Sequence, residues 1–153
     1  MRIFISMLIV GIISCNTLCQ INVALGDSDS TKNDKLKLEC FTGIPSEIQG
    51  GATMLFYLSS SDRKAGKYIC ITDMGSLAYI VNNGKPIVLG YVDNIKTKDV
   101  YYYSSNNYKL KVEVKKVISQ GDETSVFNAV LTIIDIKNKN MKTVLNVICE
   151  YSE

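Results

Sequence analysis

The 153-residue sequence contains no histidine, no tryptophan and only two prolines. Histidine is the commonest general base and the commonest zinc ligand, so its absence removes the simplest routes to acid–base and zinc chemistry. The sequence has no glycine-rich phosphate loop, and no spacing of serine, lysine or carboxylate residues marks a catalytic pair. We therefore predict a protein that is not an enzyme and that uses no metal or other cofactor.

An excess of charge of one sign is also lacking. Seventeen basic residues face fifteen acidic ones, which gives a formal net charge of +2. Such a balanced chain does not indicate nucleic acid or an anionic membrane surface as a partner. The lysines between residues 96 and 116 are typical of a solvated strand surface with protected edges.

No apolar run is long enough to cross a bilayer as a helix, for which about 20 residues are needed. The longest, residues 3–13, follows the positively charged Arg2. A short apolar run after a basic start is typical of a secretory signal peptide, which we assign to residues 1–19. The protein is therefore expected to be secreted or extracytoplasmic.

The end of this signal allows two interpretations. Small residues precede both Gln20 and Asp27, as a signal peptidase requires, and cleavage at either would release a soluble protein. Residues 12–15, however, resemble a bacterial lipobox, in which the cysteine is lipidated and becomes the mature N-terminus. Cys15 is therefore a candidate lipidation site, and the alternative location is the cell envelope.

The remainder divides into a short linker and one domain. Residues 20–34 are small and polar without an apolar period, so we expect a flexible linker. Residues 35–153 have the length of a single domain. Within it, residues 108–115 alternate strictly between apolar and charged or polar side chains, as a half-buried strand requires.

Further strands follow at intervals of eight to twelve residues. Asn83-Gly84 between two apolar runs is a strong hairpin signal, because both residues tolerate positive φ. The expected strands are 36–42, 52–58, 67–72, 76–81, 86–92, 100–103, 108–118, 125–136 and 142–151, with one helical turn near 46–49. Eight or nine short strands without a long helix predict an all-β fold, either an antiparallel sandwich or a small closed barrel.

Three cysteines remain in the mature domain, and export would place them where disulfides persist. Cys40 and Cys149 fall on inward-facing positions of the first and last expected strands. We predict a Cys40–Cys149 disulfide, which would stabilise the fold by up to about 4–5 kcal/mol in the chain-entropy account. Cys70 would then be a buried free thiol, and a Cys40–Cys70 bond is the alternative.

Two family resemblances follow from these cysteines. Residues 38–40 and 66–70, with Tyr68 two residues before Cys70, resemble the cysteine strands of immunoglobulin domains, although the core tryptophan is missing. The lipobox, the early Cys40, the hairpin and the late Cys149 resemble the lipoproteins that inhibit c-type lysozymes. That resemblance implies a closed antiparallel barrel and an inhibitory role. The family's Ser-Gly-x-x-Tyr loop is absent, because residues 97–101 lack the glycine.

Tyrosines concentrate in one part of the chain. Tyr101, Tyr102 and Tyr103 are consecutive, and Tyr108 follows. Neighbouring strand residues point to opposite faces, so Tyr102 must oppose the other two. Exposed tyrosines are favoured anchors at binding surfaces, which makes these four the candidate binding residues. The alternative interpretation is that they stabilise the sheet through cross-strand pairs.

These observations predict an exported, non-enzymatic β-domain that binds a protein or glycan through a sheet face or a loop end. Nucleic acid is not an expected partner, and a membrane would be contacted only through an N-terminal lipid. One alternative is a lipid-anchored envelope protein with a structural or hydrolase-inhibiting role. Another is a carrier of a small apolar ligand, which a large apolar cavity would favour.

Overall fold

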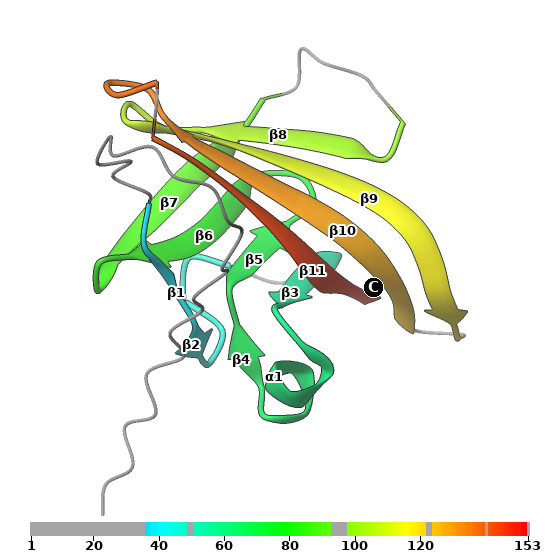
Figure 1. Cartoon of the computed structure of the whole chain (residues 1–153). Coiled ribbons are helices and arrows are strands. Elements are labelled where there is room, and N and C mark those ends of the chain that lie inside the picture. The colour runs from blue at the N-terminus through cyan, green and yellow to red at the C-terminus, as the bar shows by residue number, and fades with distance from the viewer. Residues whose placement is uncertain (1–35, 49–50, 93–97, 122–123, 140, 153) are drawn as a thin grey trace, which may run out of the picture.

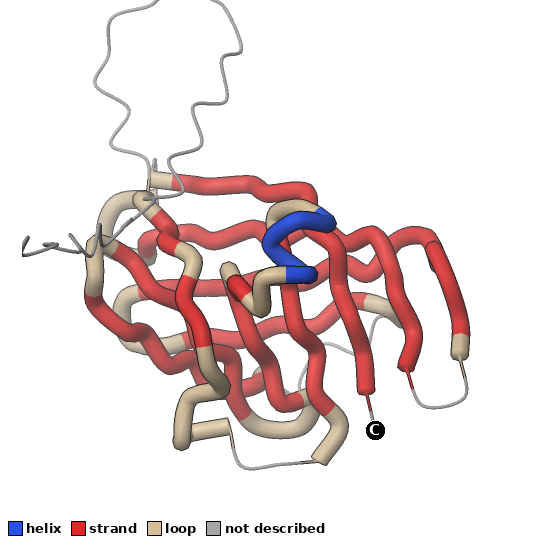
Figure 2. The backbone as a smooth tube through the Cα atoms, turned by 90° about the horizontal axis from the view of Figure 1, so that it is seen from below, coloured by secondary structure: helices blue, strands red, loops and turns tan. Residues whose placement is uncertain are grey.

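The computed structural model describes residues 36–48, 51–92, 98–121, 124–139 and 141–152. The assigned signal peptide 1–19 with Cys15, and the linker 20–34, lie outside the described residues. Strands make up most of the described chain, and α1 (Ser60–Lys64) is its single helix (Figure 2). Within the described ranges no helix is long and apolar enough to span a membrane.

Eleven strands are described (Figure 1). Three of them have only two residues each, and the last three have 13, 12 and 11 residues. In chain order they are β1 (Leu38–Glu39), β2 (Phe41–Thr42), β3 (Thr53–Tyr57), β4 (Lys67–Tyr68), β5 (Cys70–Asp73), β6 (Leu77–Asn82), β7 (Lys85–Tyr91), β8 (Val100–Ser104), β9 (Tyr108–Gln120), β10 (Thr124–Asp135) and β11 (Lys142–Ser152).

Eight of these strands close into an antiparallel barrel. Their order is β6-β5-β3-β11-β10-β9-β8-β7, and the pairing of β7 back to β6 closes the ring. β1 adds to β6, while β2 and β4 form a separate two-stranded ribbon. The predicted all-β antiparallel single domain is confirmed, and of the two predicted architectures the chain adopts the barrel. This is also the architecture that the lysozyme-inhibitor resemblance implied.

The side-chain pattern of β9 explains how the barrel interior is filled. Leu110 and Val112 are buried, while the intervening Lys111 stays on the outer face. The same alternation around the ring directs one face of every strand inward. The fully buried interior side chains include Phe56, Ile80, Leu89, Tyr103, Leu110, Val112, Leu131 and Ile133.

The closing hairpin between β6 and β7 turns as its sequence predicts. Asn83 and Gly84 both adopt positive φ, 50° and 69°. This is the backbone of a two-residue hairpin turn whose twist matches that of the strands it joins. The β6–β7 register runs from Asn82 opposite Lys85 to Leu77 opposite Gly90.

Two expected strands are each divided in the structure, for one shared reason. Glu39 pairs with Val81 of β6, but the next position along β6, Ile80, pairs with Cys70 of β5. The chain after β1 therefore leaves the sheet, and Phe41 pairs with Tyr68 of β4 instead. Expected strand 36–42 thus becomes β1 and β2, and expected strand 67–72 becomes β4 and β5.

The segment between β3 and β4 contains α1. Ser59 caps the helix, because its side-chain oxygen accepts a hydrogen bond from the backbone N–H of Asp62 at 3.1 Å. The helical turn expected at 46–49 is a single turn, in which Ile48 N–H donates to the Pro45 carbonyl at 3.0 Å.

The inward alternation predicts a clear difference between two valines. Val112 of β9 is fully buried, whereas Val144 of β11 is 53% exposed. Val112→Ala should lower the free energy of unfolding by about 2–3 kcal/mol, because it removes buried methyl groups and leaves a cavity. The matched change Val144→Ala should cost less than about 1 kcal/mol. Equal losses in chemical denaturation would contradict the assignment of the two faces.

Candidate functional site

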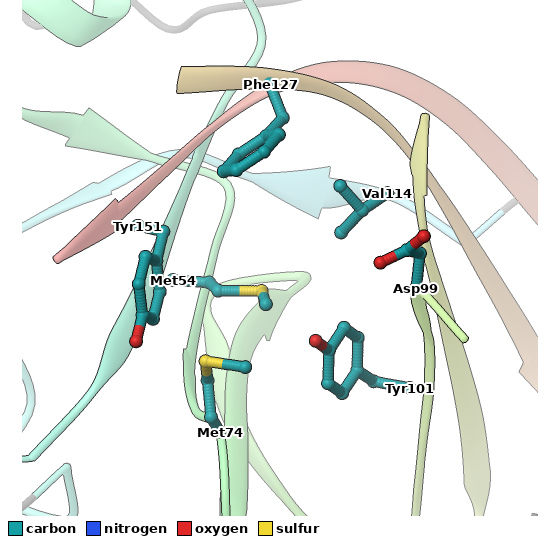
Figure 3. A pocket seen from close by; sticks show the side chains of 7 residues that line it. All are labelled: Met54, Met74, Asp99, Tyr101, Val114, Phe127 and Tyr151. Atoms are coloured by element: carbon teal, nitrogen blue, oxygen red, sulfur yellow. The ribbon is translucent and has the colours of Figure 1, made fainter. Parts of the chain in front are cut away.

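A pocket of about 180 Å³ lies at one end of the barrel interior (Figure 3). Most of its lining is apolar or aromatic, and the side chains come from strands far apart in the chain. The lining residues are Met54, Met74, Asp99, Tyr101, Val114, Phe127 and Tyr151. It is therefore the barrel, and no single motif, that assembles this site.

Strand alternation places these side chains directly beyond the core. Tyr101 lies two residues before the buried Tyr103 on β8, and Val114 lies two residues after the buried Val112 on β9. Phe127 similarly precedes the buried Ala129 by two residues, across a register shift in the β9–β10 pairing. The pocket therefore continues the inward face of the barrel to its open end.

The two methionines are held on adjoining strands. Met54 on β3 pairs with Thr72 of β5 on one side and with Tyr151 of β11 on the other. Met74 follows β5, and its backbone N–H donates to the Ala52 carbonyl at 3.1 Å, which fixes the end of β5 against β3. Methionine side chains are flexible and polarisable, so they can adjust to ligands of different shape.

Asp99 contributes the one carboxylate of the lining. Its φ is 61°, in the left-handed region that costs most non-glycine residues about 1–2 kcal/mol, although aspartate tolerates it better than most. Its carbonyl accepts a hydrogen bond from the Val114 N–H at 2.9 Å. This bond anchors the entry to β8 and places the Asp99 side chain at the edge of the pocket, where the residue is exposed to solvent.

Tyr101 brings a hydroxyl into the pocket (Figure 3). Burial of its side chain raises the pKa of the phenol, and the nearby Asp99 carboxylate raises it further. The hydroxyl therefore stays protonated at neutral pH and can donate a hydrogen bond. Together with Asp99, it gives a largely apolar pocket two polar groups on one side.

The four tyrosines singled out from the sequence occupy different environments. Tyr103 is 1% exposed, its ring lies edge-on to that of Tyr91 at 5.6 Å, and it belongs to the core. Tyr101 lines the pocket, while Tyr102 lies on the outer face opposite Lys111. Tyr108 packs against the core, and its hydroxyl accepts a hydrogen bond from Asn82 Nδ2 at 3.5 Å. The four side chains therefore do not form one exposed patch.

Sequence reasoning found Tyr101 but missed most of the pocket. Met54, Met74, Phe127 and Tyr151 carry no local motif and are separated by up to about a hundred residues. The only sequence pattern that they share is the alternation of inward-facing residues, which each of them continues toward the end of its strand. That signal identifies a barrel end only after the strand order is known.

A second polar group lies outside the barrel, where α1 meets β11. Arg63 Nε donates to Glu150 Oε2 at 2.7 Å, and the Tyr57 hydroxyl donates to the same carboxylate at 3.4 Å. Burial and the Glu150 charge both raise the pKa of Tyr57. A more open hollow of about 500 Å³ here is lined by Ser60, Arg63, Lys64 and Glu150. These contacts hold α1 against the barrel. The Glu150 charge is already paired with Arg63, so we assign this group a structural role.

Cys149 is buried as predicted and Cys40 is half-buried, but no disulfide bond forms among the described residues. Cys149 and Cys70 both pair with Phe56, from opposite sides of β3. Cys40 follows β1, which joins the sheet at β6, beyond β5. The predicted Cys40–Cys149 bond is not formed: Cys149 is a free thiol on β11, and β1, after which Cys40 follows, is separated from β11 in the sheet order by β6, β5 and β3. Cys70 is a buried thiol, as expected.

Across the described ranges no group of three or more histidine, cysteine, aspartate or glutamate residues is placed to hold a metal ion. The chain matches no protein-family model, no curated protein and no solved structure in the comparisons made. A role must therefore be inferred from the chemistry of the pocket.

The two faces of β8 predict different costs for two neighbouring substitutions. Tyr103→Ala should lower the free energy of unfolding by about 3–5 kcal/mol, because it empties a fully buried site. Tyr102→Ala, on the outer face, should cost about 1 kcal/mol or less. Urea titrations followed by circular dichroism provide the measurement. A larger loss for Tyr102→Ala than for Tyr103→Ala would show that the facing of β8 is reversed.

The buried thiol of Cys149 predicts a specific loss of stability in alkali. Burial raises its pKa from an ordinary value near 9 to about 12, with a further contribution from the Glu150 carboxylate. The thiol ionises first in the unfolded chain, so its contribution is fully present below pH 9 and is lost as the pH rises toward 12. The free energy of unfolding should fall by up to about 1.4 kcal/mol per pH unit from this group.

Cys149→Ala supplies the comparison, because it removes this titration and leaves the lysines and tyrosines unchanged. Between pH 9 and 10.5, under reducing conditions, the variant should lose stability less steeply than the parent protein. Parallel slopes for the two proteins would rule out a raised pKa at Cys149.

Proposed function

We propose that this chain is an exported, non-enzymatic binding protein whose barrel takes a small, largely apolar ligand into the pocket at its end. The observation that carries the proposal is the pocket of about 180 Å³ itself, lined by aromatic rings, thioethers and a valine. Export is supported by the signal-like residues 1–19, and a non-enzymatic role by the absence of histidine and of a marked catalytic pair.

The size of the pocket limits the ligand. Sites for drug-sized molecules usually measure about 300–1,000 Å³, whereas an engineered cavity of about 150 Å³ in another protein holds benzene. The pocket here is close to the second in volume but is open to solvent. Its ligand is therefore a compound of benzene-like size, or the terminal group of a longer molecule that extends into solvent past Asp99.

The shape of the lining favours binding over a purely structural role. A packed barrel end would be filled by its own side chains, as the interior around Leu131 and Ile133 is. At this end Phe127, Tyr101 and Tyr151 line a pocket that is open to solvent, and the Met54 side chain extends between them (Figure 3). A ligand that covers this apolar lining removes it from water and would stabilise the folded state.

The expected macromolecular partner has less support from the geometry. The expectation of such a partner relied on Tyr101, Tyr102, Tyr103 and Tyr108 as surface anchors. Tyr103, however, is in the core, and Tyr101 lines the pocket. Tyr102 is the member that lies on the outer face. Binding of a protein or glycan through that face, and lipid anchoring through Cys15, stay predictions.

The test is a titration of the full chain with 3,3-dimethyl-1-butanol, a compact neutral probe, while the methionine methyl groups are observed by NMR. The methyl signals of Met54 and Met74 should shift and saturate together. Met141 should not respond, because it follows β10, at the end of that strand opposite Phe127. Its methyl group is therefore an internal control.

Val114→Phe is the matched variant, because it fills the pocket and keeps an apolar residue at the same position. The shifts should then disappear while the thermal midpoint stays near that of the parent protein. Unchanged shifts in the variant, or equal shifts at Met141, would refute binding at this site.

A further inference from the structure

The lining of the pocket is asymmetric in charge. It contains three aromatic rings, two thioethers and one carboxylate, and none of the seven lining residues is lysine or arginine. Lys98, the neighbour of Asp99, is exposed and is not part of the lining. A lining with one carboxylate, several aromatic rings and no basic side chain favours a positively charged ligand over a negatively charged one.

Aromatic faces attract cations. The ring quadrupole places negative charge on both faces, and a cation within about 6 Å of the centroid gains about 0.5–2 kcal/mol, more where water is excluded. Recognition of quaternary ammonium groups commonly uses several rings together. Phe127, Tyr101 and Tyr151 all line the pocket, with the Met54 thioether between them (Figure 3). The polarisable sulfurs of Met54 and Met74 are compatible with a methylated ammonium group.

The position of Asp99 is maintained against a local energetic cost. Its left-handed φ of 61° is unfavourable for a residue with a Cβ atom, and the hydrogen bond from the Val114 N–H holds it there. Residues held in such conformations concentrate at functional sites. None of the ion pairs found within the described ranges uses the Asp99 carboxylate.

A neutral apolar ligand would not account for this residue. Such a ligand gains nothing from a carboxylate at the pocket edge, and binding would remove part of the hydration of that carboxylate at a cost. A cation offsets that cost by direct attraction. The Tyr101 hydroxyl, which stays protonated, can serve as a hydrogen-bond donor to a polar group on the same ligand.

We infer that the ligand is a small organic cation, an alkylammonium compound whose charged end lies among the rings and beside the Asp99 carboxylate. This inference rests on the proposed function and adds the chemical class of the ligand. Because Asp99 is exposed at the pocket edge, its attraction is screened by salt, and the preference for charge falls as ionic strength rises.

The experiment compares two probes of equal shape. Choline and 3,3-dimethyl-1-butanol differ in that a quaternary nitrogen in the first replaces a quaternary carbon in the second. Both are titrated into the full chain, and the shifts of the Met54 and Met74 methyl groups give the dissociation constants. Choline should bind at least about tenfold more tightly in low salt, which corresponds to about 1.4 kcal/mol.

Asp99→Asn is the matched variant, since asparagine also tolerates the left-handed backbone and has nearly the same shape as aspartate. It should reduce the choline affinity toward that of the neutral probe and leave the affinity for the neutral probe within about twofold. In 1 M sodium chloride, screening of the Asp99 charge should likewise reduce the choline affinity of the parent protein toward its affinity for the neutral probe.

The outcomes separate the two proposals. Equal binding of both probes by the parent protein would retain the ligand pocket and overturn its preference for a cation. A choline preference that survives Asp99→Asn would overturn the assignment of Asp99 to cation recognition. If neither probe shifts Met54 or Met74, both the proposed function and this inference fail.

Discussion

The pairing of β6 with β7 is the constraint on which the rest of the structure depends. Six residue pairs join these strands, and they close an eight-stranded ring in which both faces of every strand acquire a definite role. Without this closure the inward side chains of β6 and β7 would lie at the edges of an open sheet. The short hairpin at Asn83-Gly84 makes the closure local in sequence, so little chain entropy opposes it. By contrast, β7 and β8 share only two register pairs, Gly90 with Ser104 and Tyr91 with Tyr103.

The fold could be predicted from the sequence to the extent that it depends on local periodicity. Alternation identified β9 and its inward residues Leu110 and Val112, and turn chemistry identified the hairpin. The division of 36–42 into β1 and β2 could not be predicted, because it depends on which strand pairs with β6. Glu39 pairs with Val81, but Cys70 of β5 already pairs with the next residue, Ile80. The sequence of neither strand shows which partner it will pair with.

The cysteines show the same limit. Alternation correctly placed Cys149 on the inner face, where it is fully buried. Facing inward does not make two side chains neighbours, however, since the register of β3 inserts Phe56 between Cys149 and Cys70. A disulfide requires Cα atoms within about 7 Å, a distance set by strand order and not by the facing of each strand. Of the pocket, Tyr101 was found because it belongs to a visible tyrosine cluster, whereas Met54 and Phe127 carry no such mark.

The pocket and Asp99 are two features of one end of the barrel that cost stability. The interior elsewhere is closely filled, yet at this end a pocket remains open, and the turn residue Asp99 at its edge keeps positive φ, as Asn83 does in the hairpin. Each feature lowers stability. A single substitution could relieve either one, such as glycine at position 99 or a larger side chain at position 114. Local rules are broken in this way mainly where function requires it. The two features also meet at Val114, whose side chain lines the pocket and whose backbone N–H donates to the Asp99 carbonyl. Their coincidence at one site is the strongest physical reason to regard this end of the barrel as the place where the protein acts.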